Sequence, residues 1–182
     1  MMIWENHNSK VGLIFFIIPK IKDGEMLFLS GNTDFFQTLG RKKGVFWVDN
    51  TKFIVKLEKT KSNAFVWLRP RRFGKSFFLC MLDAYYNILY KDKFQDNFGH
   101  LYIGKHPTPE QGSYFVLNLN FATLDTSSVE LFHQSLHGFI NDACIAFSNM
   151  YDTNDITIHE NNSVRTMNSL IEFIKKGIGK VK

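Results

Sequence analysis

Gly74, Lys75 and Ser76 are the residues whose types and order could bind phosphate. A lysine ammonium can contact the β- and γ-phosphates of a nucleotide, and a serine hydroxyl can serve as a ligand of Mg²⁺. A glycine before the lysine lets the backbone approach the ligand, because glycine has no Cβ atom. The tripeptide therefore predicts a nucleotide-binding loop, with ATP and Mg²⁺ as ligands and Ser76 as the residue that contacts the metal.

The residues before the tripeptide extend this pattern. Residues 69–76 match the phosphate loop GxxxxGK[ST] at its defined positions except the first, where Arg69 replaces glycine. When such a loop joins a strand to a helix, its backbone N–H groups and the helix dipole converge on one anion. We therefore predict a phosphate site formed by Arg71, Arg72, Phe73, Gly74, Lys75 and Ser76. Two interpretations of the paired arginines stay open: they add charge at the phosphates, or they face a second polyanion or a neighbouring domain.

The segments around this loop are expected to alternate between strands and helices. Two apolar runs, one before the loop and one in SYFVLNLNF, indicate strands buried on both faces, as in a parallel sheet. The predicted strands are Val45–Val48, Asn63–Leu68 and Ser113–Phe121. Apolar residues at helical spacing predict five helices. The first covers residues 33–39, and the second follows an N-cap at Asp49 or Asn50 and ends at residue 56. The others run from 75 to about 90, from 129 to about 151, and from about 164 onward. The predicted fold class is α/β, with a parallel-sheet core and flanking helices over residues 31–182 and an N-terminal extension over residues 1–30.

The segment RPRRFGKS, followed by FFLCMLDAYYN, resembles the hallmark of the AAA-ATPase-like family, whose members carry RPRRFGK[ST] in place of a glycine-led Walker A motif. The upstream segment SGNTDFFQTLGRKKGVFWVDNTKFI and the later segment SYFVLNLNF also resemble that family. The resemblance implies a P-loop NTPase fold and an ATP-binding module, often joined to a C-terminal nuclease-like domain. It also implies that Arg69 is a family trait.

The same resemblance places Asp49 and Thr51 in the segment that leads toward the adenine side of the nucleotide. Side chains of these types are also common at helix N-termini, where their oxygens accept backbone hydrogen bonds. We favour helix capping for both residues and keep adenine contact as the alternative.

Hydrolysis of ATP would need an acidic residue at the end of a buried strand to hold Mg²⁺. The predicted strand SYFVLNLNF carries Asn118 and Asn120 instead, and Asp125 follows only beyond it. In the resembling family, the Walker B strand ends in Asp-Glu and would follow a helix like the one expected before Gly179. The sequence ends at Lys182, so we expect it to be truncated before that strand. The prediction is therefore ATP binding, with no residue assigned to hydrolysis.

The composition favours polyanionic partners. The 182 residues include 22 Lys+Arg and 17 Asp+Glu, a formal net charge of +5. The chain has only two cysteines, Cys80 and Cys144, with no CxxC motif and no metal-ligand spacing. This usage favours a reduced, intracellular location, cytoplasmic or nuclear. The apolar run VGLIFFII is followed by Pro19 and Lys20 rather than by small cleavage-site residues, and no run reaches the roughly 18 residues that span a bilayer. We therefore expect no membrane partner.

A metal site on a helix is one alternative. His133 and His137, in HQSLH, have the spacing of the zincin motif HExxH. Gln134 stands in place of the general base, and no third ligand is apparent. We therefore interpret both histidines as partly exposed residues of a helix.

Binding of nucleic acid without catalysis is the alternative function. A basic and aromatic surface could contact a nucleic-acid backbone. Its residues would be Arg69, Arg71, Arg72 and Lys75, with Lys42, Lys43 and Trp47 upstream. Another protein domain is a further partner that fits the paired arginines. The sequence predicts no oligomeric state.

Overall fold

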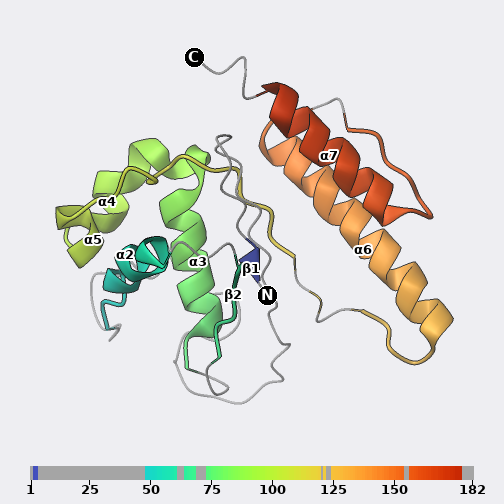
Figure 1. The fold of residues 1–182 in the computed structure, drawn as a ribbon, viewed down its shortest axis with the longest axis horizontal. Coiled ribbons are helices and arrows are strands. Elements are labelled where there is room, and N and C mark those ends of the chain that lie inside the picture. The colour runs from blue at the N-terminus through green and yellow to red at the C-terminus, as the bar shows by residue number, and fades with distance from the viewer. Residues whose placement is uncertain are drawn as a thin grey trace.

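A computed structural model describes residues 2–3, 48–60, 64–68, 73–119, 121, 124–153 and 156–177 of the chain. These residues are mainly helical (Figure 1). The helices are α2 (Lys52–Lys59), α3 (Lys75–Tyr86), a 3₁₀-helix (Ile88–Lys93), α4 (Phe94–Phe98), α5 (Tyr102–Lys105), α6 (Val129–Met150) and α7 (Ser163–Gly177), and the strands are β1 (Met2–Ile3) and β2 (Ala64–Phe65). Within these ranges, no helix combines the length and the apolar character that crossing a membrane requires.

The predicted α/β fold, a P-loop NTPase fold with a parallel-sheet core, is not what the described residues form. β1 and β2 are two residues long each and pair in antiparallel register, with Met2 opposite Phe65. Residues 113–119 are extended. Among the described residues they pair with another segment through an isolated parallel bridge between Tyr114 and Asn87, and they form no strand of a sheet. The fold-class prediction is therefore wrong for the described part of the chain, which contains no parallel-sheet core.

The apolar run in residues 113–119 is buried between helices rather than within a sheet. Tyr114 and Val116 belong to a hydrophobic core around α3, whereas Leu117 and Leu119 belong to a second core with α6 and α7. A short apolar run fits either environment, because its length and composition do not distinguish a central strand from an extended segment covered by helices. For residues 113–119 the burial was predicted correctly and the sheet was not. For the strand predicted over Asn63–Leu68 the burial on both faces was wrong as well, because Val66 and Leu68 are exposed.

The helices agree better with the sequence pattern. α6 begins at the predicted Val129, and α7 begins at Ser163, one residue before the predicted start. α3 begins at Lys75 as predicted but ends at Tyr86, because Asn87 has an extended backbone (φ −68°, ψ 126°) and its side chain accepts a hydrogen bond from the N–H of Leu89. The predicted helix over residues 33–39 lies outside the described residues. So does the strand predicted over Val45–Val48, except for Val48 itself, which is exposed and not part of a strand.

The first core surrounds α3, which α2, α4 and α5 cover (Figure 1). At its centre Tyr85 is fully buried, and its ring makes edge contacts with Tyr86, Phe94 and Phe98 at centroid distances of 5.1, 6.0 and 5.6 Å. Edge-to-face packing of this kind adds to the free energy gained by removing aromatic surface from water. The core therefore fixes α3, the helix that begins with the predicted site.

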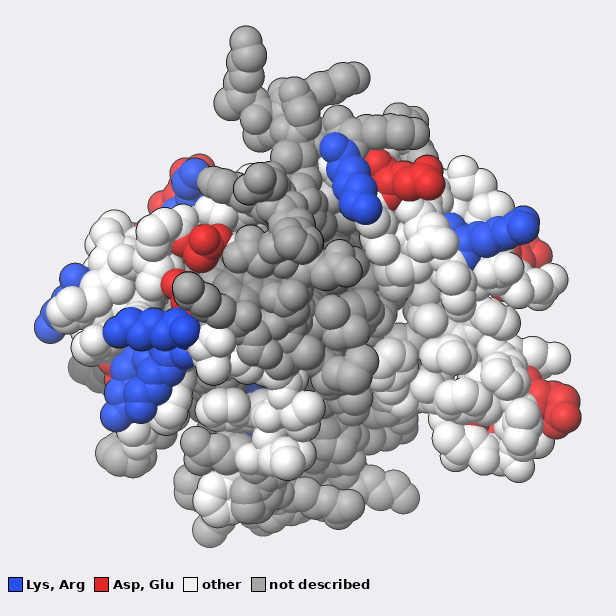
Figure 2. All heavy atoms as spheres, in the orientation of Figure 1, with Lys and Arg blue, Asp and Glu red and all other residues white. Residues whose placement is uncertain are grey.

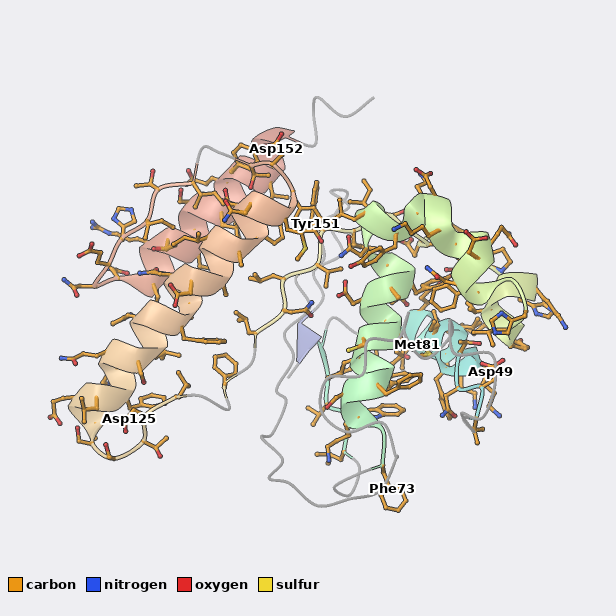
Figure 3. All side chains as sticks on the ribbon, turned by 180° about the vertical axis from the view of Figure 1, so that it is seen from behind. Asp49, Phe73, Met81, Asp125, Tyr151 and Asp152 are labelled. Carbon is orange, nitrogen blue, oxygen red and sulfur yellow. The ribbon has the colours of Figure 1, made fainter. Side chains whose placement is uncertain are left out.

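The second core lies in the hairpin of α6 and α7. Cys144 and Phe147 of α6 pack there with Leu170 and Ile174 of α7. Tyr151, just after α6, packs its ring on Phe115 at 5.0 Å and accepts a hydrogen bond from the Val116 N–H at 2.9 Å (Figure 3). The extended segment 113–119 therefore joins the hairpin to the part of the protein built around α3.

Candidate phosphate-binding site

The chain turns onto the first residues of α3 through a left-handed glycine. Gly74 has φ 69° and ψ 24°, and its carbonyl accepts a hydrogen bond from the Phe78 N–H at 2.9 Å. Only glycine adopts this conformation without a steric cost. A Cβ atom added at Gly74 would meet no other atom within 4 Å, so glycine is required for its backbone conformation rather than for space.

The N-terminus of α3 has the properties of an anion site. The first N–H groups of a helix have no acceptor within the helix, and the helix dipole places partial positive charge there. The first turn of α3 contains no acidic residue that would neutralise this charge. Lys75 and Ser76 are its first two residues, and both are half-buried. An ammonium and a hydroxyl thus stand at the positive end of a twelve-residue helix.

Of the six predicted site residues, the structure describes Phe73 to Ser76, which are consecutive in the sequence. Phe73 is 63% exposed, and Figure 3 shows its ring pointing away from α3 at the start of this turn. Arg71 and Arg72 lie outside the described residues, as does Arg69. The geometry of the site is therefore described from Phe73 onward.

An aromatic cluster supports the first turn of α3 from the protein side. The rings of Trp67 and Phe78 stack at a centroid distance of 4.3 Å and an interplanar angle of 12°. Phe53 of α2 meets both rings edge-on, at 5.9 and 6.5 Å. Trp67 and Phe53 were not predicted as supports of the site. The sequence gives no signal for this, because Val66, Trp67 and Leu68 are all apolar, and the structure leaves Trp67 half-buried between the exposed Val66 and Leu68.

Asp49 and Thr51 join the start of α2 to the start of α5. Oδ1 of Asp49 accepts hydrogen bonds from the Thr51 N–H and hydroxyl at 2.9 and 2.6 Å, and its Oδ2 accepts one from the Tyr102 N–H at 2.8 Å. The Thr51 hydroxyl oxygen accepts a hydrogen bond from the Ile103 N–H at 3.1 Å. Burial opposes the charged carboxylate, but the hydrogen bonds from Thr51 and Tyr102 outweigh it and lower the pKa of Asp49.

These bonds bear on the two interpretations of Asp49 and Thr51. Both side chains accept hydrogen bonds from the first N–H groups of α5, so they cap that helix rather than α2. The predicted capping of α2 is therefore wrong, since its N-cap residue Thr51 makes no side-chain capping hydrogen bond, and the helix that the two side chains bond is about fifty residues away in sequence. Their oxygens already have protein partners, which leaves adenine contact without structural support.

The two histidines of HQSLH both lie on α6. His133 is exposed, and Nδ1 of the half-buried His137 lies 2.9 Å from the hydroxyl of Ser163. Over the described ranges, no group of three or more His, Cys, Asp or Glu side chains could hold a metal ion. These positions agree with the interpretation of two partly exposed helix residues.

Two of the polar residues considered for hydrolysis have structural partners, and the third, Asn120, lies outside the described residues. Asn118 donates a hydrogen bond to Oδ2 of Asp83 at 3.1 Å. Asp125 is exposed and accepts hydrogen bonds from the hydroxyl and the N–H of Ser127, which lower its pKa. Sequence reasoning missed the buried carboxylate of Asp83, which lies on α3 itself. The neighbouring residues of the helix, such as Cys80, did not indicate that Asp83 would be bonded by Asn118.

The left-handed Gly74 is thus followed by Lys75 and Ser76 at the start of α3, an arrangement typical of helix ends that bind anions. A family model described as "Predicted AAA-ATPase" matches residues 31–181. The chain therefore belongs to the AAA-ATPase-like family, as its RPRRFGKS segment predicted. Comparison with curated proteins and comparison with solved structures found no match.

Proposed function

We propose that the chain is an ATP-binding module in which the N-terminus of α3 holds the triphosphate. In this proposal the Lys75 ammonium contacts the β- and γ-phosphates, and the Ser76 hydroxyl is a ligand of Mg²⁺. Gly74 allows the backbone to approach the phosphates. Family membership supports nucleotide binding in general, and the local geometry supports this place for it.

The left-handed Gly74 directly before α3 is the observation that carries the proposal. This turn leaves the positive end of α3 free of any side-chain cap at its N-cap position. A phosphate bound there would accept hydrogen bonds from main-chain N–H groups and would receive the charge of Lys75. The same arrangement would give a carboxylate a weaker site, because it has less charge to place against the helix end and the ammonium.

The residues before Gly74 complete the proposed site. Arg71 and Arg72 would add positive charge around the phosphates. Phe73, with its exposed ring, would border the nucleotide. Mg²⁺ usually keeps several water ligands and takes only one or two from the protein, so Ser76 together with phosphate oxygens is a suitable donor set. When bound, the ion would neutralise charge on the β- and γ-phosphates.

The test is a substitution of the proposed phosphate ligand. We expect Lys75→Ala to weaken ATP binding more than about tenfold, as measured by isothermal titration calorimetry with Mg²⁺ present. The circular dichroism spectrum should stay unchanged, because Lys75 is only half-buried and lies at the first position of the helix, so its replacement should leave the helix intact. Lys91→Ala is the matched control, since it removes an exposed lysine from the 3₁₀-helix. Equal ATP affinity in Lys75→Ala and the control would refute the proposal.

A further inference from the structure

Three lysines form a row along α2. Lys52, Lys56 and Lys59 are separated by four and three residues, so they lie on one face of the helix, and all three are exposed. Seven residues of α-helix rise about 10.5 Å, which is the approximate length of the row. We call these three residues the lysine row. It lies outside the Gly-Lys-Ser segment.

An aromatic ring restrains part of the lysine row. The Nζ atoms of Lys52 and Lys56 lie 5.9 and 5.2 Å from the centroid of the Phe53 ring, within the range of cation–π attraction. Phe53 is itself held by edge contacts with Trp67 and Phe78. The two ammonium groups therefore keep a defined place, which reduces the conformational entropy lost when they bind a partner.

Within the described residues, neighbouring carboxylates do not neutralise the charge of the lysine row. Glu58 is the acidic residue of α2, and its Oε1 accepts hydrogen bonds from Tyr86 and Thr108 at 3.1 and 2.8 Å, inside the protein. Among the residues that the structure describes, none of the three lysines pairs with an acid. Figure 2 shows basic side chains gathered over α2, and the exposed Lys105 of the adjoining α5 adds to them. The surface is thus locally positive.

We propose that the lysine row binds the phosphate backbone of a single-stranded nucleic acid. Phosphates follow one another along a strand at about 3.4 Å or more of axial distance, so a row of about 10.5 Å can neutralise three of them. A regular row of like charges fits a regular polyanion better than the irregular carboxylates of an acidic protein. The row is one helix wide, whereas a duplex presents two phosphate strands. The half-buried ring of Phe53, which contacts Lys52 and Lys56, is of a type on which a base can stack.

The salt dependence of binding tests this inference. Affinity for a fluorescein-labelled oligothymidylate of about 16 nucleotides would be measured by anisotropy on the full chain between about 50 and 200 mM salt. Each phosphate contact on a single strand contributes about −0.7 to the slope of log affinity against log salt concentration. The combined variant Lys52→Gln, Lys56→Gln and Lys59→Gln should therefore lose about 2 from the magnitude of the slope. Over that salt range, wild-type affinity should fall about 20-fold further than that of the variant.

Matched controls separate this surface from the rest of the protein. The pair Lys91→Gln and Lys93→Gln removes exposed lysines from the 3₁₀-helix and should leave the slope unchanged. The triple variant should keep its ATP affinity, so a failure of this inference is distinguishable from a failure of the proposed function. An unchanged slope in the triple variant would overturn the inference. Equal or tighter binding of a duplex of the same length, or of polyglutamate at equal charge, would overturn it as well.

Discussion

The side-chain amide of Asn118 donates a hydrogen bond to Oδ2 of Asp83, over 3.1 Å, and thereby joins the extended segment to α3. The amide of Asn87 donates to the other carboxylate oxygen, Oδ1, over 2.9 Å. The helix whose first turn carries Lys75 is therefore fixed near its other end by two amide donors. In the sequence, Asn118 occupies the predicted strand in which hydrolysis would need an acidic residue. In the fold, its amide donates a hydrogen bond to an acidic residue of α3.

The pair predicts a specific pH dependence of stability. Burial raises the pKa of Asp83, and the hydrogen bonds from Asn87 and Asn118 oppose that effect only in part. The folded state then binds a proton at this carboxyl more readily than the unfolded state does. Stability from this group should fall as pH rises from its ordinary pKa of 3.8 toward the raised value. Asp83→Asn should remove this part of the pH profile, measured as thermal unfolding by circular dichroism from about pH 4 to pH 7.

Asp125→Asn is the control for that prediction. Asp125 is exposed, and its hydrogen bonds from Ser127 lower its pKa, so any stability it contributes is lost as pH falls. Over the measured range from about pH 4 to pH 7, Asp125→Asn should therefore leave the profile nearly unchanged, because the contribution of Asp125 is lost only below its ordinary pKa of 3.8. A profile for Asp83→Asn that superimposes on that of the wild type would contradict the prediction.

The contact between Tyr151 and Val116 should stabilise the docking of the helical hairpin. The Tyr151 hydroxyl accepts from the Val116 N–H at 2.9 Å and lies 3.3 Å from the Val116 carbonyl oxygen, and Val116 is buried. Tyr151→Phe would leave both backbone groups without this partner, at an expected loss of about 1–2 kcal/mol in the free energy of unfolding. Urea denaturation would measure it. Tyr102→Phe, on an exposed ring, should change the free energy by less than about 0.5 kcal/mol, and equal losses in both variants would argue against the contact.

The sequence was a good guide where the deciding interactions are local. Helical spacing of apolar residues predicted α6 and the start of α3, because an amphipathic helix repeats its apolar positions in every turn of a continuous segment. The Gly-Lys-Ser segment predicted a site because its residues are contiguous and the helix that orients them follows at once. The left-handed conformation of Gly74 was not predicted, because the pattern assigned this glycine to close approach of the backbone to a ligand.

The sequence was a poor guide where the deciding partner is distant. Nothing near Asp49 shows that its carboxylate accepts a hydrogen bond from Tyr102, 53 residues later. The run in residues 113–119 has the apolar character of a central strand, and only the positions of α3, α6 and α7 determine that helices cover it instead. Long-range contacts of this kind leave no periodic signal in either segment.

Gly74 offers a test of the backbone conformation at the site. Gly74→Ala should lower the free energy of unfolding by about 1–2 kcal/mol, because an L-residue is strained at φ 69° although space for its Cβ exists. It should also weaken ATP binding if the turn presents the helix end to phosphate. Gly138→Ala is the matched control, since Gly138 lies inside α6 with open space around it and should gain about 0.5–1 kcal/mol. Two variants with the same midpoint of urea unfolding would contradict the assigned conformation.

The hydroxyl of Thr51 should contribute measurably to joining α2 and α5. Thr51 is fully buried, and its hydroxyl donates to Asp49 at 2.6 Å while accepting from the Ile103 N–H at 3.1 Å. Thr51→Val keeps the shape of the side chain but leaves a buried N–H without an acceptor, so the free energy of unfolding should fall by about 1–3 kcal/mol. Thr60→Val removes an exposed hydroxyl that bonds the Lys56 carbonyl at 2.8 Å, and it should cost less than about 0.5 kcal/mol. Both are measured by urea denaturation, and a Thr51→Val protein as stable as the Thr60→Val protein would show that the hydrogen bonds to α5 do not hold the two helices together.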